Sequence, residues 1–149
     1  METHSVDEKW LKNGKEINSM TDQQLNRALA ELMGYTVYHY DKDVPERCYY
    51  MLVDPTGDYS TIERPTEEIA WLDAPWFTGD PATSLEVQTA ACAIDKEGYI
   101  RNLVLVKWGE SPILYSSVSN STAADIACAT PRERAEAAYI TLQGAKGNG

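Results

Sequence analysis

The chain of 149 residues carries 23 acidic against 13 basic side chains, which gives a formal net charge of -10. This balance excludes a nonspecific DNA or RNA binder, which needs a basic surface, and it disfavours an anionic membrane surface as a partner. The length suits one domain with a real core, and a hydrophobic content of 43% is ordinary for a globular protein.

The chain begins with a polar stretch, and residues 1–19 predict a flexible N-terminal extension. Residues 20–144 predict a single α+β domain, and residues 145–149 a disordered tail. Thr21 and Gln24 have the spacing of a capping box, so a helix is expected to begin there and to end at Gly34.

Two short β-strands are expected next, at residues 35–40 and 48–53, because both stretches are rich in aromatic and β-branched side chains. The acidic stretch 58–74 follows and has the least regular pattern, with a short turn of helix expected at 69–72. This part of the sequence therefore predicts a strand pair and an irregular acidic connection.

The second half predicts a helix, two more strands and a last helix. Asp80 and Pro81 are a typical N-cap and first helical residue for a helix at 82–95, which Gly98 is expected to end. Residues 99–108 and 113–119 read as strands, with a polar loop at 120–125 and a short strand or extended lead-in at 126–129. Thr130 and Pro131 open the last helix, which should end at Gly144.

The fold class expected from this order is α+β. The elements follow as αββαββα, which predicts an antiparallel sheet of about four strands sandwiched between helices.

Short motifs at the element boundaries carry a family resemblance. They are Thr78-Gly79-Asp80-Pro81-Ala82 before a helix, Trp108-Gly109 at a hairpin, and Ala129-Thr130-Pro131 before the alanine-rich helix Arg134-Ala135-Glu136-Ala137-Ala138. Together with the opening helix at 21–33, this succession resembles the phage ABA-sandwich domain family over residues 20–143. The resemblance implies a helix–sheet–helix sandwich encoded by a phage, and it assigns no catalytic residue. The N-terminal extension and the acidic stretch 58–73 depart from the family.

The candidate ligand site centres on the turn before the helix at 82–95. Aromatic side chains there can stack on a base, a glycine lets a ligand approach the backbone, and basic side chains can meet a phosphate. The alternative is that the aromatic residues pack in the core and the arginines are solvated. The candidate ligand-binding residues are Trp76, Phe77, Thr78, Gly79, Arg101, Lys107 and Arg132.

No catalytic or metal motif accompanies this turn. The sequence has no GxSxG, P-loop or GxGxxG pattern, and His39 stands without a partner motif, so no catalytic residue, metal ligand or cofactor is predicted. Cys48, Cys92 and Cys128 are odd in number and widely spaced, which disfavours a disulfide framework or a zinc site and favours a reducing cytoplasm.

The favoured function is a non-enzymatic phage binding protein in the cytoplasm of the host cell. Its most concrete form is an anti-defence sponge that forms a homo-oligomer and sequesters a nucleotide-type immune signal, such as a cyclic nucleotide. The alternatives are an acidic protein–protein inhibitor that uses the surface around 63–73 against a host defence enzyme, and a phage accessory or morphogenesis factor. An enzyme is the least favoured function.

Overall fold

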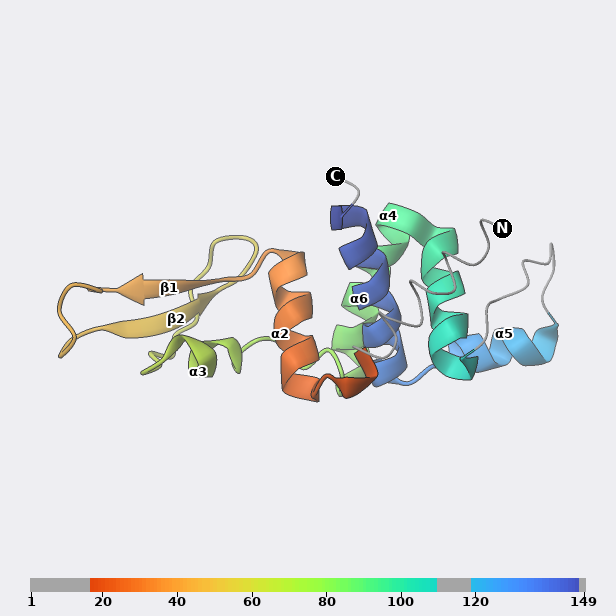
Figure 1. The fold of residues 1–149 in the computed structure, drawn as a ribbon, viewed down its shortest axis with the longest axis horizontal. Helices are drawn as coiled ribbons and strands as arrows, with labels where there is room; N and C mark the ends of the chain where they lie inside the picture. Colours follow the sequence, from red (N-terminus) through yellow and green to blue (C-terminus); the bar gives the residue numbers. More distant parts are fainter. Residues whose placement is uncertain (1–16, 110–118, 148–149) are drawn as a thin grey trace.

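The computed structural model describes residues 17–109 and 119–147. The molecule is elongated, with a β-hairpin at one end, a group of packed helices in the middle and a short helix at the other end (Figure 1). The elements are α2 (Asp22–Met33), β1 (Thr36–Tyr40), β2 (Tyr49–Val53), α3 (Glu67–Trp71), α4 (Pro81–Trp108), α5 (Asn120–Ala127) and α6 (Pro131–Gly147).

The first helix is capped as the sequence predicts. The Thr21 hydroxyl accepts a hydrogen bond from the Gln24 backbone N–H at 3.1 Å, and the Gln24 side chain accepts one from the Thr21 N–H at 2.8 Å. Gly34 ends α2 in the left-handed region, at a φ of 100°, where a side chain would be strained. Both predicted ends of this helix are therefore confirmed.

The two strands expected in the first half also form, as an antiparallel hairpin that pairs Tyr38 with Met51 at its centre. The outer edge of β2 is bridged by the following segment, because Tyr50 exchanges backbone hydrogen bonds of 2.8 Å with Arg64. Helix α3 contacts both strands, in the region where a short turn of helix was expected.

The prediction of an antiparallel sheet of about four strands sandwiched between helices is wrong. Within residues 17–109 and 119–147 the sheet has only the two strands β1 and β2, and helices dominate the rest. The expected strand at 99–108 is the second half of α4, where Tyr99 and Leu103 are buried on one helical face. The expected strand at 113–119 lies almost entirely outside the described residues.

A kink in α4 explains the error. Asp95 leaves the helical conformation, at φ -153° and ψ 86°, and its carboxylate accepts a hydrogen bond from the Gly98 N–H at 2.9 Å. Asp95 thus caps a new helical segment, and Gly98 lies near the start of that segment instead of ending a helix. The second half of α4 runs back beside the first (Figure 1), and the Tyr99 hydroxyl bonds Gln88 across the bend at 2.9 Å.

The last third contains more helix than expected. The stretch predicted as a loop at 120–125 belongs to α5, because the Ser119 hydroxyl accepts a hydrogen bond from the Thr122 N–H at 3.1 Å and caps it. Thr130 and Glu133 form a capping box at the predicted start of α6, with hydrogen bonds of 2.9 and 3.1 Å. Gly144 does not end α6, which continues to Gly147.

The core lies between α2, α4 and α6, and α4 and α6 share the most extensive contact. Short side chains on α6, with Ala135, Ala137 and Ala138 fully buried, allow the two helices to approach closely. The larger buried side chains Tyr99, Phe77 and Leu103 fill the remaining space. Among the described helices, none has both the length and the apolar composition that crossing a membrane requires.

Candidate functional site

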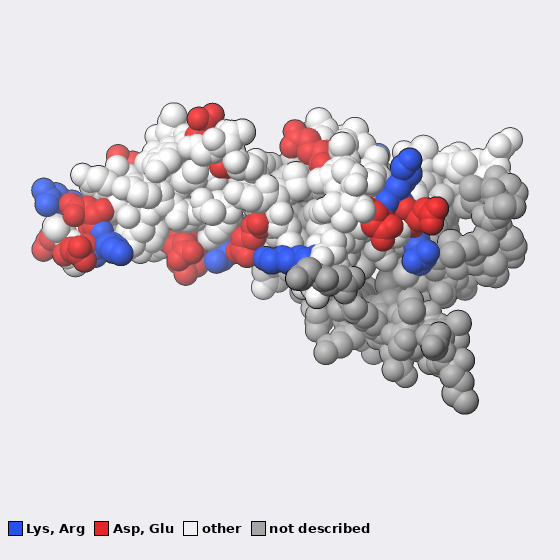
Figure 2. All heavy atoms as spheres, turned by 90° about the horizontal axis from the view of Figure 1, so that it is seen from above, with Lys and Arg blue, Asp and Glu red and all other residues white. Residues whose placement is uncertain are grey.

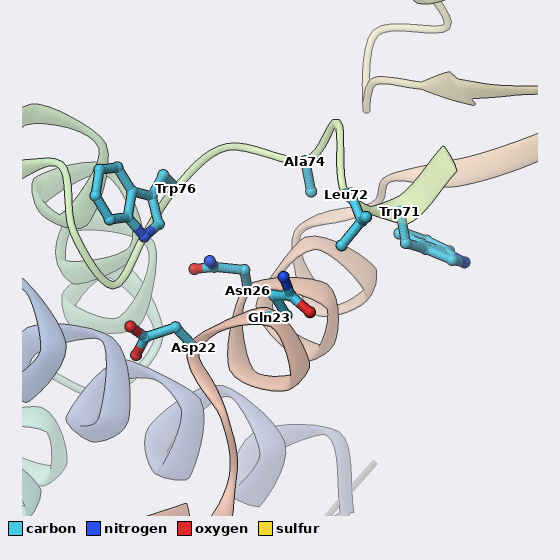
Figure 3. Close-up of a pocket in the computed structure, with 7 residues that line it drawn as sticks. All are labelled: Asp22, Gln23, Asn26, Trp71, Leu72, Ala74 and Trp76. Carbon is cyan, nitrogen blue, oxygen red and sulfur yellow. The ribbon is translucent and has the colours of Figure 1, made fainter. Parts of the chain in front are cut away.

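A groove lies between the start of α2 and the connection from α3 to α4. Figure 3 shows Trp76 at one end of this groove, Trp71 at the other, and the side chains of Gln23 and Asn26 between them. The hollow has a volume of about 350 Å³ and is lined by Asp22, Gln23, Asn26, Trp71, Leu72, Ala74 and Trp76. This aromatic groove is the candidate site.

Trp76 is held in place by the turn that follows it. The Trp76 carbonyl accepts hydrogen bonds from the backbone N–H groups of Gly79 and Asp80, at 3.2 and 2.9 Å. The indole lies directly against the Gly79 backbone, so that a Cβ on Gly79 would overlap ring atoms Cε2 and Cζ2. Trp76 is nevertheless 60% exposed, so its ring is positioned by the backbone and still accessible.

Two side-chain carboxamides supply polar groups to the groove. The Asn26 oxygen Oδ1 accepts a hydrogen bond from the Thr78 backbone N–H at 3.0 Å, which ties α2 to the turn after Trp76. The Asn26 Nδ2 makes no hydrogen bond with a described residue and is available to a ligand. Gln23 is exposed beside it and offers both a donor and an acceptor.

The electrostatics of the aromatic groove depend on Asp22. It is the one ionised residue in the lining, and no Lys or Arg is among the lining residues. The Asp22 carboxylate accepts a hydrogen bond from Arg132 at 2.8 Å. The groove therefore favours a neutral or cationic group over an anion.

Arg132 acts as a clamp on the start of α2. Besides Asp22, its guanidinium donates to the carbonyl oxygens of Ile17 and Met20, at 3.0 and 2.9 Å, and lies 3.7 Å from the Glu136 carboxylate. Burial raises the pKa of Glu136, and the nearby Arg132 charge partly offsets the rise. A phosphate would have to displace these partners to reach the Arg132 guanidinium.

The sequence-predicted site residues separate into groups. Trp76 lines the aromatic groove, and Arg132 borders it through Asp22. Thr78 and Gly79 are not lining residues: the Thr78 backbone N–H bonds Asn26, and the Gly79 backbone packs against the indole. Phe77 is 1% exposed and belongs to the core.

The other basic candidates are on the second half of α4. The Lys107 ammonium is paired with Glu133 at 3.1 Å, and Arg101 makes no ion pair with the part of the chain that is described. Neither side chain lines the groove. The structure does not bring the predicted phosphate-binding cations to the predicted stacking ring.

Sequence reasoning missed the floor of the groove. None of Asp22, Gln23 and Asn26 was among the predicted site residues. The hydrogen bond between Asn26 and Thr78 joins residues 52 positions apart, and no local sequence pattern predicts such a contact.

The groove offers binding groups and no catalytic set. Its lining side chains supply one carboxylate and two carboxamides, with no thiol, hydroxyl or imidazole. His39 lies on the hairpin, where it stacks on Tyr50 with ring centroids 4.1 Å apart. Across residues 17–109 and 119–147, no group of three His, Cys, Asp or Glu side chains is placed to hold a metal ion.

Comparison of the chain with protein families, curated proteins and solved structures found no match. The resemblance to the phage ABA-sandwich family remains a prediction from short motifs.

Proposed function

We propose that this chain is a non-enzymatic binding protein that holds a flat heterocyclic ring, such as the base of a nucleotide-type signal, against Trp76. The observation that carries the proposal is the position of the Trp76 indole, which is fixed by Gly79 and yet 60% exposed at the end of a groove. Contact with the Gly79 backbone already restricts the indole, so stacking on it should cost less entropy than stacking on an unrestrained ring.

The energetics suit a ring-shaped ligand. Stacking of a base on an aromatic side chain contributes about 1–3 kcal/mol. Gln23 offers a donor and an acceptor to the edge of a nucleobase, and Asn26 adds the Nδ2 donor that Thr78 leaves unused. Ring stacking and edge pairing together select heterocycles that carry both a donor and an acceptor.

The charge distribution limits how a nucleotide would bind. Asp22 repels an anion, and the guanidinium of Arg132 is already bonded to Asp22 and to two carbonyl groups. We therefore place the base in the aromatic groove and the phosphates outside it, toward solvent. Binding of this kind would remove an immune signal from solution without cleaving it, as a phage anti-defence sponge does.

Retention of intact ligand tests the proposal. Purified protein is incubated with cyclic mono-, di- and trinucleotides and with nucleotide-ribose signals, desalted, heated and examined for released small molecules. We expect at least one compound to be released intact by the wild type and not by Trp76→Ala. Absence of retention across the panel, or release only of cleaved products, contradicts a sponge.

A second candidate function is binding of a basic segment of another protein. Trp76 and Leu72 are 60% and 55% exposed, and Asp22 lies in the same groove, so a partner's Lys or Arg side chain could stack on the indole and pair with the carboxylate. The acidic surface expected at 63–73 stays a separate prediction, although within it Asp73 forms a two-bond ion pair with Arg64 at 2.7 and 2.9 Å.

Ionic strength separates the two functions. Binding of a basic segment from host lysate should weaken strongly between low and high salt, because the long-range attraction between opposite charges is screened. Binding of a nucleoside through stacking should change little. Asp22→Asn would abolish the first mode and strengthen the second.

A further inference from the structure

The β-hairpin has one paired edge and one free edge. Tyr50 bonds the Arg64 backbone in both directions at 2.8 Å, and the Leu52 carbonyl accepts from the Ser60 N–H at 2.7 Å. The backbone groups of Tyr50 and Leu52 therefore point away from β1. Because backbone direction alternates along a strand, the groups of the intervening β2 residues point toward β1.

The register then fixes which groups of β1 are unpaired. Tyr38 lies opposite Met51, and Val37 and His39 lie opposite Leu52 and Tyr50. Tyr38 thus bonds β2, while the backbone N–H and C=O groups of Val37 and His39 face outward. No described residue forms a backbone hydrogen bond with these outward groups.

The free edge lacks the features that normally prevent strand pairing. The sequence of β1, Thr-Val-Tyr-His-Tyr, contains no proline, glycine, lysine or acidic residue. All five residues favour or tolerate extended structure. An unpaired row of alternating donors and acceptors is complementary to another extended strand.

We propose that a second copy of this chain pairs with the free edge, β1 against β1 in antiparallel orientation. The register that pairs all of β1 places Tyr38 on the two-fold axis, opposite Tyr38 of the second copy. Val37 then lies opposite His39, and their outward groups exchange hydrogen bonds. The result is a continuous sheet across two copies in the order β2–β1–β1–β2.

The side chains near the seam suit a second copy of the same surface. Tyr38 is 39% exposed and packs against Tyr59, while Tyr40 stacks on Tyr49 with centroids 4.7 Å apart. In a non-hydrogen-bonded antiparallel pair the Cα atoms are only about 4.5 Å apart, so the two Tyr38 rings would meet and extend this aromatic row.

Charge does not oppose pairing at the seam itself. The hairpin end carries both charge signs (Figure 2), and Arg47 pairs with Asp41 at 3.3 Å. The formal charge of -10 repels two copies at long range, so added salt should strengthen the dimer. An assembly held by ion pairs would weaken under the same change.

Sedimentation equilibrium of the full chain tests the interface through Tyr38. We expect a concentration-dependent dimer for the wild type, and at least about tenfold weaker self-association for Tyr38→Lys or Tyr38→Glu, because like charges would lie directly opposite. An equal mixture of the two variants should recover the dimer as a heterodimer. Tyr49→Lys, on the same face but on β2, is the matched control and should dimerise normally.

Two results overturn the proposal: a monomeric wild type at every concentration reached, or a Lys–Glu mixture that associates no better than either variant alone. Should the variants fail to fold, hydrogen exchange on the wild type decides. The amides of Val37 and His39 should gain protection as concentration rises, and unchanged exchange at both positions overturns the pairing. No residue of β1 or β2 lines the aromatic groove, so this test and the ligand measurements can fail separately.

Discussion

The indole of Trp76 lies on the backbone of Gly79, in the space that any side chain at position 79 would occupy. Gly79→Ala should therefore push the ring out of its present position. Since Trp76 is 60% exposed, the ring can move at small cost in stability, but stacking geometry is lost. We expect nucleoside affinity to fall at least about tenfold, which is a loss of about 1.4 kcal/mol, measured by calorimetry.

Gly144→Ala is the matched control for this glycine. Nothing lies within 4 Å of the Cβ that it would add, and the residue lies inside α6. Alanine in a helix interior is favoured over glycine by about 1 kcal/mol, so this variant should be more stable and bind ligand as the wild type does. Equal affinity of Gly79→Ala and Gly144→Ala would contradict the role of Trp76.

Arg132 should contribute more to the stability of the fold than to the binding of a charged ligand. Its guanidinium satisfies two backbone carbonyls and the Asp22 carboxylate, and it faces the buried Glu136. Arg132→Ala leaves these acceptors without a partner, and we expect the free energy of unfolding to fall by about 2–4 kcal/mol. Chemical denaturation measures this loss, and a change below about 0.5 kcal/mol would contradict the clamp.

Arg132→Lys separates charge from geometry. Lysine keeps the positive charge near Glu136 but lacks the planar fork that reaches several acceptors together. We expect it to restore only a minor part of the lost stability. Full restoration would mean that charge alone, and not the set of hydrogen bonds, holds the start of α2 against α6.

The raised pKa of Glu136 determines the direction in which folding stability should change with pH. Burial raises its pKa, so the folded protein binds the proton more tightly than the unfolded chain. Its contribution to stability is therefore lost as pH rises from the ordinary glutamate range through the raised pKa. Glu136→Gln removes this titration, and its stability relative to the wild type should increase over that window in urea titrations. A pH-independent difference between the two proteins would contradict the assignment.

Substitutions of Gly98 and Asp95 at the kink in α4 should have non-additive effects on stability. A Cβ on Gly98 would overlap the Asp95 carboxylate that caps the second helical segment. Gly98→Ala should cost about 1–3 kcal/mol of stability through this overlap. In an Asp95→Ala background the overlap disappears, so the double variant should cost less than the sum of the single ones. Additive losses in a denaturation cycle would show that the overlap carries no energy.

The sequence predicted those parts of the fold that local chemistry determines. The capping boxes at Thr21 and Thr130, the left-handed Gly34 and the Asp80–Pro81 helix start depend on neighbouring residues, and all are confirmed. The hairpin strands were also found, because aromatic and β-branched residues fill them. These signals act within a few residues.

The second half of α4 could not be predicted in the same way. Residues 99–108 are rich in Leu, Val and Ile at positions that fit either periodicity, and Gly98 looked like a helix end. Burial of Tyr99 and the bond from Asn102 to Thr141 on α6, at 2.9 Å, favour the helix. These contacts are tertiary, as is the meeting of Asn26 with Thr78 that forms the groove floor.

The central claim is that Trp76 binds a flat ring, and titration calorimetry tests it most directly. Nucleosides and their monophosphates are titrated into the wild type, Trp76→Ala and Trp108→Ala, the last a control tryptophan that is 43% exposed outside the groove. We predict binding of a nucleoside at least as tight as that of its monophosphate, lost in Trp76→Ala and kept in Trp108→Ala. Affinity that survives Trp76→Ala, or wild-type binding of no compound, would contradict the claim.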